Sequence, residues 1–317
     1  MTQNRRQFIS NVAMAGAAIP FTSTLLSNLL PEQEKSFEVR LFSKPLDRYN
    51  TGFMCECASE AGIKGFDLTV RPGGKIEPSA VETDLPQFIE QAGKYELKTD
   101  MMVTGILSAS DPFTERVLKA ASSLGIRYYR PGWKAYDLKS GIRASIANFR
   151  TDLSEIDKLN RKYKINGSYQ NHSGTMIGGS VWDLDLLMSG FSVEFTGIQY
   201  DVRHAMVEGA NSWILGLNLI APMISTLAVK DFTWQIINGK PRVESVPLGE
   251  GMVDWDLYFR TVKELKITCP VTLHVEYPLF EKGEENLPLS KQKEIIVRKL
   301  KKDNDFLTNY LSRYGLV

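Results

Sequence analysis

Residues 198–204 read Ile198-Gln199-Tyr200-Asp201-Val202-Arg203-His204, a short apolar strand that breaks into polar groups at its C-terminal end. Three further segments repeat this pattern, at residues 167–172, 227–231 and 272–277. The carboxyl ends of the strands of a parallel barrel meet at one rim. Four strands of this kind therefore predict one shared polar site at the mouth of a parallel barrel. The only three histidines of the chain lie in these segments: His172, His204 and His274.

The rest of the chain alternates between strand-like and helix-like segments from residue 36 onward. Strands are expected at residues 37–42, 63–70, 99–104, 126–129, 165–170, 195–200, 225–229 and 271–275. Helices are expected between them, one capped by Thr83-Asp84, one opened by Asp111-Pro112, and others at 47–61, 138–163, 181–188, 211–219, 253–265 and 290–314. Eight such units predict a (β/α)8 TIM barrel that forms a single domain over residues 36–317. A doubly wound open sheet is the competing architecture, but its glycine-rich phosphate-binding turn is missing from the sequence.

Two long loops are expected on the functional rim of this barrel. Residues 234–251 are predicted to form an irregular loop after the seventh strand, and residues 277–288 another after the eighth. Loops in these positions can cover a substrate. The charged run at 291–305 is interpreted as the solvated face of the last helix.

Composition excludes several classes of function. The 317 residues carry a net charge of +1, with 43% apolar and 24% charged residues, as in an ordinary globular protein. Nothing in this balance favours nucleic-acid binding. The three cysteines form neither a disulfide framework nor a CxxC metal pair and are interpreted as small buried residues: Cys55, Cys57 and Cys269.

The first 31 residues are predicted to be a signal peptide rather than part of the fold. Asn4-Arg5-Arg6-Gln7-Phe8-Ile9 resembles a twin-arginine export signal, and a weakly apolar stretch follows at 12–30. Pro20 and several polar residues interrupt that stretch, which argues against a stable membrane span. The expected location is the periplasm or another exported compartment. The alternative is a disordered tail with a chance pair of arginines.

The order of several short motifs resembles that of a known superfamily. They are Gly65-Phe66-Asp67-Leu68, Gln170-Asn171-His172, Asp201-x-x-His204, Lys230-Asp231, Pro247-Leu248-Gly249-Glu250-Gly251 and Glu276. Together they resemble the xylose-isomerase-like TIM barrels, which include sugar phosphate isomerases and epimerases, ketose 3-epimerases, inosose dehydratases and endonuclease IV. The resemblance covers nearly all of residues 36–317. It implies the TIM-barrel fold and an enzyme that acts on carbohydrates.

The resemblance also implies a divalent ion held by Glu, Asp, His and Glu on strands five to eight. The chain keeps Asp201 and Glu276 but has Gln170 in place of the first Glu and Ala228 in place of the His. In one interpretation Gln170, Asp201 and Glu276 still hold an ion, with His204 or water completing the shell. Oxygen-rich ligands favour Mg²⁺ or Mn²⁺, with Zn²⁺ possible. In the other, no ion is needed because the Lys230 ammonium lies between the two carboxylates.

The chemistry implied by this superfamily is removal of a proton next to a carbonyl group. A carboxylate takes the proton and a cation stabilises the enediolate oxygen. Because the amide of Gln170 does not titrate, Glu276 is predicted to be the base, with Lys230 or His204 as its partner. The expected activity is that of a sugar isomerase or epimerase. The alternatives are a lyase or hydratase that eliminates from keto-glycosides, and a non-catalytic sugar-binding relic of the fold.

Seven further residues are predicted to contact the substrate because they follow strand ends or lie in rim loops: Asp67, Arg71, Arg130, His172, Trp234, Glu250 and His274. An arginine at a strand end can clamp a carboxylate or sugar oxygens. Each residue also has a structural alternative, such as a turn hydrogen bond for His172, a loop anchor for Glu250 or a core position for His274. The predicted partner is a small carbohydrate, without nucleic acid or membrane, and homo-oligomerisation stays open.

Overall fold

A computed structural model of the chain describes residues 38–316. The predicted signal peptide at residues 1–31 lies outside this range. Within the described residues, none of the helices combines the length and apolar character needed to cross a membrane.

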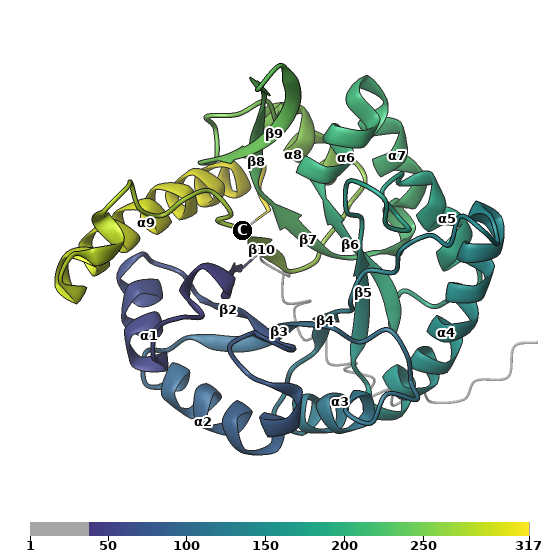
Figure 1. Cartoon of the computed structure of the whole chain (residues 1–317), viewed down its shortest axis with the longest axis horizontal. Coiled ribbons are helices and arrows are strands. Elements are labelled where there is room, and N and C mark those ends of the chain that lie inside the picture. The colour runs from purple at the N-terminus through teal and green to yellow at the C-terminus, as the bar shows by residue number, and fades with distance from the viewer. Residues whose placement is uncertain (1–37, 317) are drawn as a thin grey trace, which may run out of the picture. The chain divides into compact units, whose positions relative to one another are not determined.

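Eight parallel strands close into a barrel in the order β1-β10-β7-β6-β5-β4-β3-β2. The strands are β1 (Val39–Phe42), β2 (Gly65–Val70), β3 (Lys98–Thr104), β4 (Tyr128–Arg130), β5 (Asn166–Gln170), β6 (Thr196–Asp201), β7 (Ile224–Val229) and β10 (Val271–Leu273). Around them lie the helices α1 (Thr51–Glu60), α2 (Val81–Gly93), α3 (Thr114–Ser123), α4 (Ile142–Tyr163), α5 (Trp182–Met188), α6 (Val202–Gly209), α7 (Trp213–Ile220), α8 (Trp255–Glu264) and α9 (Leu289–Arg313). Figure 1 shows this ring of helices outside the barrel. The predicted (β/α)8 fold is confirmed.

The two faces of the barrel wall differ in polarity. On β6, Ile198 and Tyr200 belong to the hydrophobic core, and the Tyr200 ring stacks on Tyr258 of α8. Successive side chains of a strand point to opposite faces, so Gln199 and Asp201 face the lumen. The same alternation places buried polar residues inside the other strands or just beyond their ends: Asp67, Arg130, Gln170, Lys230, Thr272 and His274. The apolar core therefore lies between barrel and helices, and a polar lumen opens at the mouth.

Several predicted helix boundaries were wrong. Helix α2 begins at Val81, so that Thr83 lies in its first turn and bonds back to a carbonyl instead of capping the helix. Helix α3 begins only at Thr114, beyond the predicted start at Asp111-Pro112. Helix α6 was missed altogether. It follows β6 without a loop because Asp201, the last strand residue, is also its N-cap and accepts a hydrogen bond from the His204 backbone N–H.

The loop predicted at residues 234–251 is largely a β-hairpin. Strands β8 (Asp231–Ile237) and β9 (Lys240–Val246) pair in antiparallel fashion through an Asn238-Gly239 turn. Both turn residues have positive φ angles, 52° and 71°, as type I′ turns require. The Asn-Gly pair was the available sequence signal for this hairpin.

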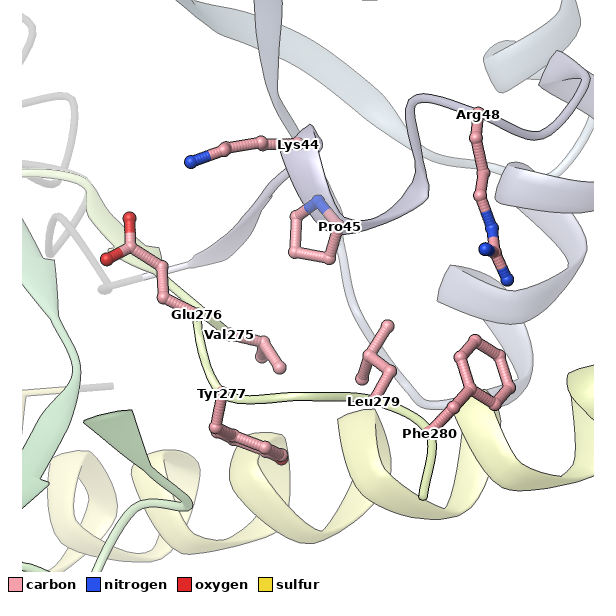
Figure 2. A pocket seen from close by; sticks show the side chains of 8 residues that line it. All are labelled: Lys44, Pro45, Arg48, Val275, Glu276, Tyr277, Leu279 and Phe280. Atoms are coloured by element: carbon pink, nitrogen blue, oxygen red, sulfur yellow. The ribbon is translucent and has the colours of Figure 1, made fainter. Parts of the chain in front are cut away.

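The predicted loop at 277–288 is present, and its first residues border a pocket. This pocket, with a volume of about 290 Å³, lies between the loop and the short 3-10 helix η1 (Lys44–Leu46) that follows β1 (Figure 2). Because β1 and β10 are neighbours in the barrel, the pocket adjoins the mouth at Glu276.

The cysteine prediction holds for two of the three residues. Cys55 and Cys57 are buried on α1, whereas Cys269 is only half-buried. Burial raises the pKa of the Cys55 thiol to about 11, which keeps it protonated near neutral pH.

Candidate active site

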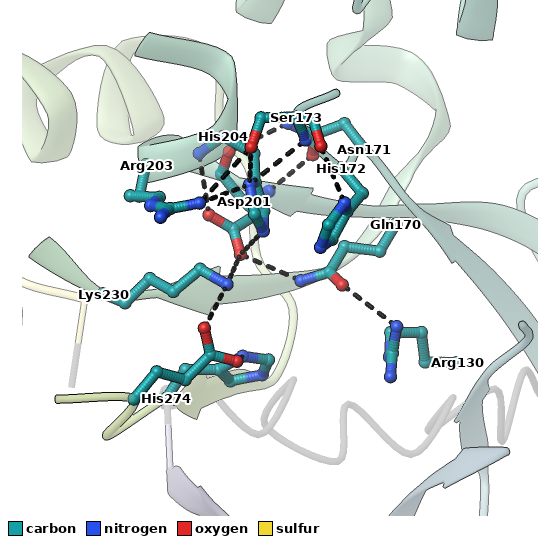
Figure 3. A network of polar contacts seen from close by, with 11 residues as sticks. Arg130, Gln170, Asn171, His172, Ser173, Asp201, Arg203, His204, Lys230 and His274 are labelled. Carbon is teal, nitrogen blue, oxygen red and sulfur yellow. Dashed lines mark hydrogen bonds and ion pairs between the residues drawn. The ribbon is translucent and has the colours of Figure 1, made fainter. Parts of the chain in front are cut away.

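An unbroken series of polar contacts runs around the mouth of the barrel (Figure 3). Arg130 Nη1 donates to Gln170 Oε1 over 3.2 Å, and Gln170 Nε2 donates to Asp201 Oδ2 over 2.9 Å. Lys230 Nζ then lies 3.2 Å from Asp201 Oδ2 and 3.0 Å from Glu276 Oε2. These residues lie at or just after the C-terminal ends of β4, β5, β6, β7 and β10. The structure thus brings together the four residues on which the predicted site depends.

Asp201 is the fixed centre of this network. It is fully buried, and its Oδ1 accepts the helix-capping hydrogen bond of α6. Its backbone N–H and C=O both pair with the Asn171 side chain, at 2.7 and 2.9 Å. The carboxylate therefore presents its Oδ2 to the lumen in one orientation, where Lys230 neutralises its charge.

The groups that donate hydrogen bonds to His204 determine which of its ring nitrogens carries the proton. The Ser173 backbone N–H and Arg203 Nη1 both donate to His204 Nδ1, over 3.2 and 2.9 Å. Burial, reinforced by the charge of Lys230, lowers the pKa of His204 well below its usual value. The neutral ring therefore carries its proton on Nε2, which lies 3.7 Å from Asp201 Oδ2. His204 is therefore next to Asp201, and Asp201 in turn pairs with Lys230. His204 has no hydrogen bond or ion pair with Glu276 among the described residues.

The predicted metal ligands Gln170, Asp201 and Glu276 do not fit a divalent ion as they are placed. A guanidinium can only donate, so Arg130 fixes the Gln170 amide with its oxygen turned away from Asp201 and its NH2 group turned toward it. The Lys230 ammonium occupies the space between the two carboxylates. Within residues 38–316, no three His, Cys, Asp or Glu side chains gather as a metal-binding group.

Glu276 is the member of the network that solvent can reach. Its side chain is 28% exposed, against 4% for Lys230. Burial alone would raise the pKa of Glu276, but Lys230 and His274 together hold it well below its usual range. His274 Nδ1 lies 3.6 Å from Glu276 Oε1, and its ring stacks on Phe42. Glu276 is therefore an ionised carboxylate at the edge of the mouth, as a base requires.

Asp67 stands apart as a buried carboxylate on β2. It is 1% exposed, and neither carboxylate oxygen has a hydrogen-bond partner among the described residues. Burial raises the pKa of Asp67 to about 7, against the opposing charge of Arg130. A buried carboxylate without a hydrogen-bond partner destabilises the fold. A residue with this cost is typical of a ligand-binding position.

Asp67→Asn should change how stability depends on pH. A raised pKa means that the folded state holds the proton more tightly than the unfolded state, so wild-type stability falls as pH rises from the usual value of 3.8 to about 7. Relative to wild type, the variant should gain about 3 kcal/mol in unfolding free energy between about pH 5 and about pH 8. Urea denaturation at both pH values measures this. Asp84→Asn, at an exposed site on α2, should show no such gain, and an equal response of both variants would contradict the prediction.

The other predicted substrate contacts divide into two groups. Arg130 is buried, with its guanidinium 4.0 Å above the Trp133 ring, and burial lowers its pKa to about 10. His172 packs between Trp133 and His204 and bonds to the Ser173 carbonyl, as its structural alternative stated. Among the described residues, three others make no hydrogen bond or ion pair to the network: Arg71, which lies over the Phe42 ring; Trp234, on the exposed hairpin; and Glu250, which pairs with Lys302 of α9.

Asp231 holds the Pro247-Leu248-Gly249-Glu250-Gly251 motif in place, and the sequence analysis did not predict this role. Its buried carboxylate accepts hydrogen bonds from the backbone N–H groups of Gly249, Gly251 and Val253, and from Trp255 Nε1. A Cβ at Gly251 would lie 2.1 Å from Asp231 Oδ1, so only glycine fits. The Pro247–Trp255 run is therefore a loop wrapped around the residue after Lys230, which holds the end of β7 in place.

A closed parallel barrel with a polar site at the C-terminal ends of its strands defines a TIM-barrel protein. Residues 55–296 match the xylose isomerase-like TIM barrel family, and the chain belongs to that family. None of the curated proteins matches the chain.

Solved structures with the same fold are similar to the chain over most of its length. The IolI protein with a bound zinc atom has a TM-score of 0.67 and 14% identity, covering 88% of this chain and 99% of that chain. D-psicose 3-epimerase from Clostridium cellulolyticum H10, with D-tagatose, has a TM-score of 0.63 and 11% identity, covering 87% and 99%. The probable 3-DHS dehydratase AsbF from Bacillus anthracis has a TM-score of 0.61 and 15% identity, covering 84% and 98%. At these identities the likeness shows the fold alone.

Proposed function

We propose that the protein is a carbohydrate-active enzyme of the isomerase or epimerase type, which removes a proton next to the carbonyl group of a sugar or keto-sugar. Glu276 is the base, and Lys230 stabilises the enediolate. The observation that carries the proposal is the position of the Lys230 ammonium, 3.0 Å from Glu276 and 3.2 Å from buried Asp201. Family membership and the epimerase among the similar structures support this type of reaction.

In the proposed reaction the substrate's carbonyl oxygen accepts a hydrogen bond from Lys230. Glu276 takes a proton from the neighbouring carbon, and the electron pair of that C–H bond moves toward the carbonyl oxygen. The resulting enediolate carries its negative charge beside the ammonium. Return of a proton to the opposite face of the same carbon gives an epimer. Return of a proton to the former carbonyl carbon, with the hydroxyl proton of the neighbouring oxygen moving to the enediolate oxygen, gives an isomer.

Substrate binding changes the strength of the base. In the free site Lys230 keeps Glu276 weakly basic, because the ammonium favours the ionised carboxylate. A carbonyl oxygen that binds Lys230 competes with Glu276 for the same N–H groups and excludes water. Both effects raise the affinity of Glu276 for a proton. Asp201, fixed by its cap and by Asn171, keeps the ammonium in position throughout.

A lyase or hydratase acting by β-elimination is the second candidate. Gln170 holds the position where the superfamily's second catalytic carboxylate is expected, and its amide is committed to Arg130 and Asp201. One base suffices to start an elimination, whereas epimerisation must also return a proton to the opposite face. The dehydratase among the similar structures has the same fold.

One experiment separates these candidates. Incubation with a panel of ketoses and keto-glycosides in D2O, followed by NMR, should show deuterium entering the sugar carbon next to the carbonyl. Elimination from a keto-glycoside would instead release the aglycone and produce an enone absorbance. Sugar binding without either change would contradict an enzymatic role and favour a binding protein.

The proposed chemistry predicts resistance to chelators. Lys230 supplies the positive charge from the chain itself, so prolonged treatment with EDTA should change kcat by less than about twofold, a barrier change of only ~0.4 kcal/mol. Elemental analysis should find less than stoichiometric divalent metal in the active protein. Loss of activity with EDTA that Mn²⁺ or Zn²⁺ restores would refute this version of the mechanism.

We also propose that the protein acts outside the cytoplasm. The support is the twin-arginine pattern at Arg5-Arg6 in the first 31 residues. Cell fractionation of wild type and of a variant with both arginines changed to lysine tests this: the wild type should be exported and the variant retained.

A further inference from the structure

The pocket beside Glu276 combines apolar walls with a charged rim. Its apolar lining comes from Pro45, Val275, Leu279 and Phe280. In Figure 2 the carboxylate of Glu276 and the ammonium end of Lys44 lie at one end of the pocket, and the Phe280 ring lies at the other. The pocket therefore begins at the proposed base and continues along an apolar surface toward Phe280.

The wall formed by the loop after β10 is held in a fixed position. Tyr277 is almost fully buried, and its hydroxyl donates to Asp303 of α9 over 2.9 Å. The Pro278 carbonyl accepts a hydrogen bond from Lys299 of the same helix. Because both residues are tied to α9, the adjoining Leu279 and Phe280 present a preformed surface, as small-molecule pockets usually do.

The far end of the pocket combines an aromatic ring with a cation. The Arg48 guanidinium lies 5.2 Å from the centre of the Phe280 ring and 4.7 Å from that of Tyr49. A cavity of about 150 Å³ with apolar walls is enough to bind benzene. A pocket of about 290 Å³ therefore has room for one substituted aromatic ring.

We propose that this pocket is the subsite for the aglycone of a glycoside, and that the aglycone is apolar or aromatic. The inference rests on the proposed function, which puts the reacting carbon of the sugar at Glu276. Since Glu276 lines both the mouth and the pocket, a substituent on that sugar extends into the pocket. A free monosaccharide at Glu276 would leave the other end of the pocket, at the half-buried Phe280 ring, unfilled. The substrate class is therefore a glycoside rather than a free sugar.

Matched methyl and phenyl glycosides of glucose and galactose, titrated calorimetrically, test this without requiring turnover. The phenyl member of at least one pair should bind about tenfold or more tightly than the methyl member, because the ring buries additional apolar surface. Phe280→Ala should remove most of that preference. Phe191→Ala is the control, since Phe191 is also half-buried with an arginine, Arg150, over its ring but lies outside the pocket. This control should keep the wild-type preference.

Equal binding of methyl and phenyl glycosides, or a preference that survives Phe280→Ala, would overturn the aglycone subsite, as would no phenyl glycoside binding at millimolar concentration. The proposed function fails separately. If the phenyl preference depends on Phe280 but no keto-sugar exchanges deuterium or undergoes elimination, the subsite stands and the chemistry is wrong. If turnover occurs without any phenyl preference, the chemistry stands and the subsite is wrong.

Discussion

Glu276→Gln should lower turnover by about 10²–10⁴-fold, the usual contribution of a general base. The amide keeps the shape of the side chain but cannot take a proton. Because Lys230 and His274 favour the charged form of Glu276, the neutral amide should also lose some stability, while Lys230 keeps Asp201 as its buried partner. Deuterium exchange into the substrate, followed by NMR at saturating substrate concentration, measures the loss as an effect on kcat.

Glu250→Gln provides the matched control for this variant. Glu250 is also an exposed glutamate paired to a lysine on the same rim, but its partner is Lys302 of α9 rather than Lys230. The control should retain activity within about twofold, which corresponds to less than ~0.5 kcal/mol in the barrier. Near-normal turnover by Glu276→Gln, or an equal loss in both variants, would remove Glu276 from the mechanism.

Lys230→Met should abolish activity and destabilise the fold by about 3–5 kcal/mol, as loss of one partner from a buried ion pair does. The substitution leaves the charge of Asp201, which is fully buried, without its cation. Urea denaturation measures the change in unfolding free energy, and the deuterium assay measures the change in turnover.

A second variant shows whether the lost stability comes from that ion pair. Adding Asp201→Asn to Lys230→Met removes the stranded charge, so the double variant should recover much of the lost stability while staying inactive. Lys302→Met, which breaks the exposed pair with Glu250, should cost less than about 1 kcal/mol. Unchanged stability of Lys230→Met would contradict the buried pair seen in the structure.

The sequence was sufficient to predict the barrel and the meeting of its polar strand ends. Both follow from short-range patterns: the strand–helix alternation predicts the closed parallel barrel, and a polar residue after an apolar strand marks the rim. Asp201, Lys230 and Glu276 each follow this pattern on a different strand. A period of two along β7 and its end also placed Lys230 and Ala228 on the same face of the wall.

Features that depend on contacts between distant residues were not predictable in this way. Gln170 was expected to offer an oxygen to an ion, but Arg130, 40 residues earlier, fixes its amide in the opposite orientation. Glu250 was expected near the substrate, but the loop that carries it is wrapped around Asp231 and leaves it beside α9. The pocket walls at Lys44 and Phe280 come from opposite ends of the chain, so no local pattern reveals them.

The ammonium held between two carboxylates also affects how the protein acquires the positive charge of its site. An exchangeable ion has to be acquired after or during folding, and it can be lost or replaced by a competing metal. A lysine is incorporated when the chain is synthesised, at one copy per molecule. Under the proposed mechanism, the fraction of working molecules would therefore depend on conformational stability and not on the supply of trace elements.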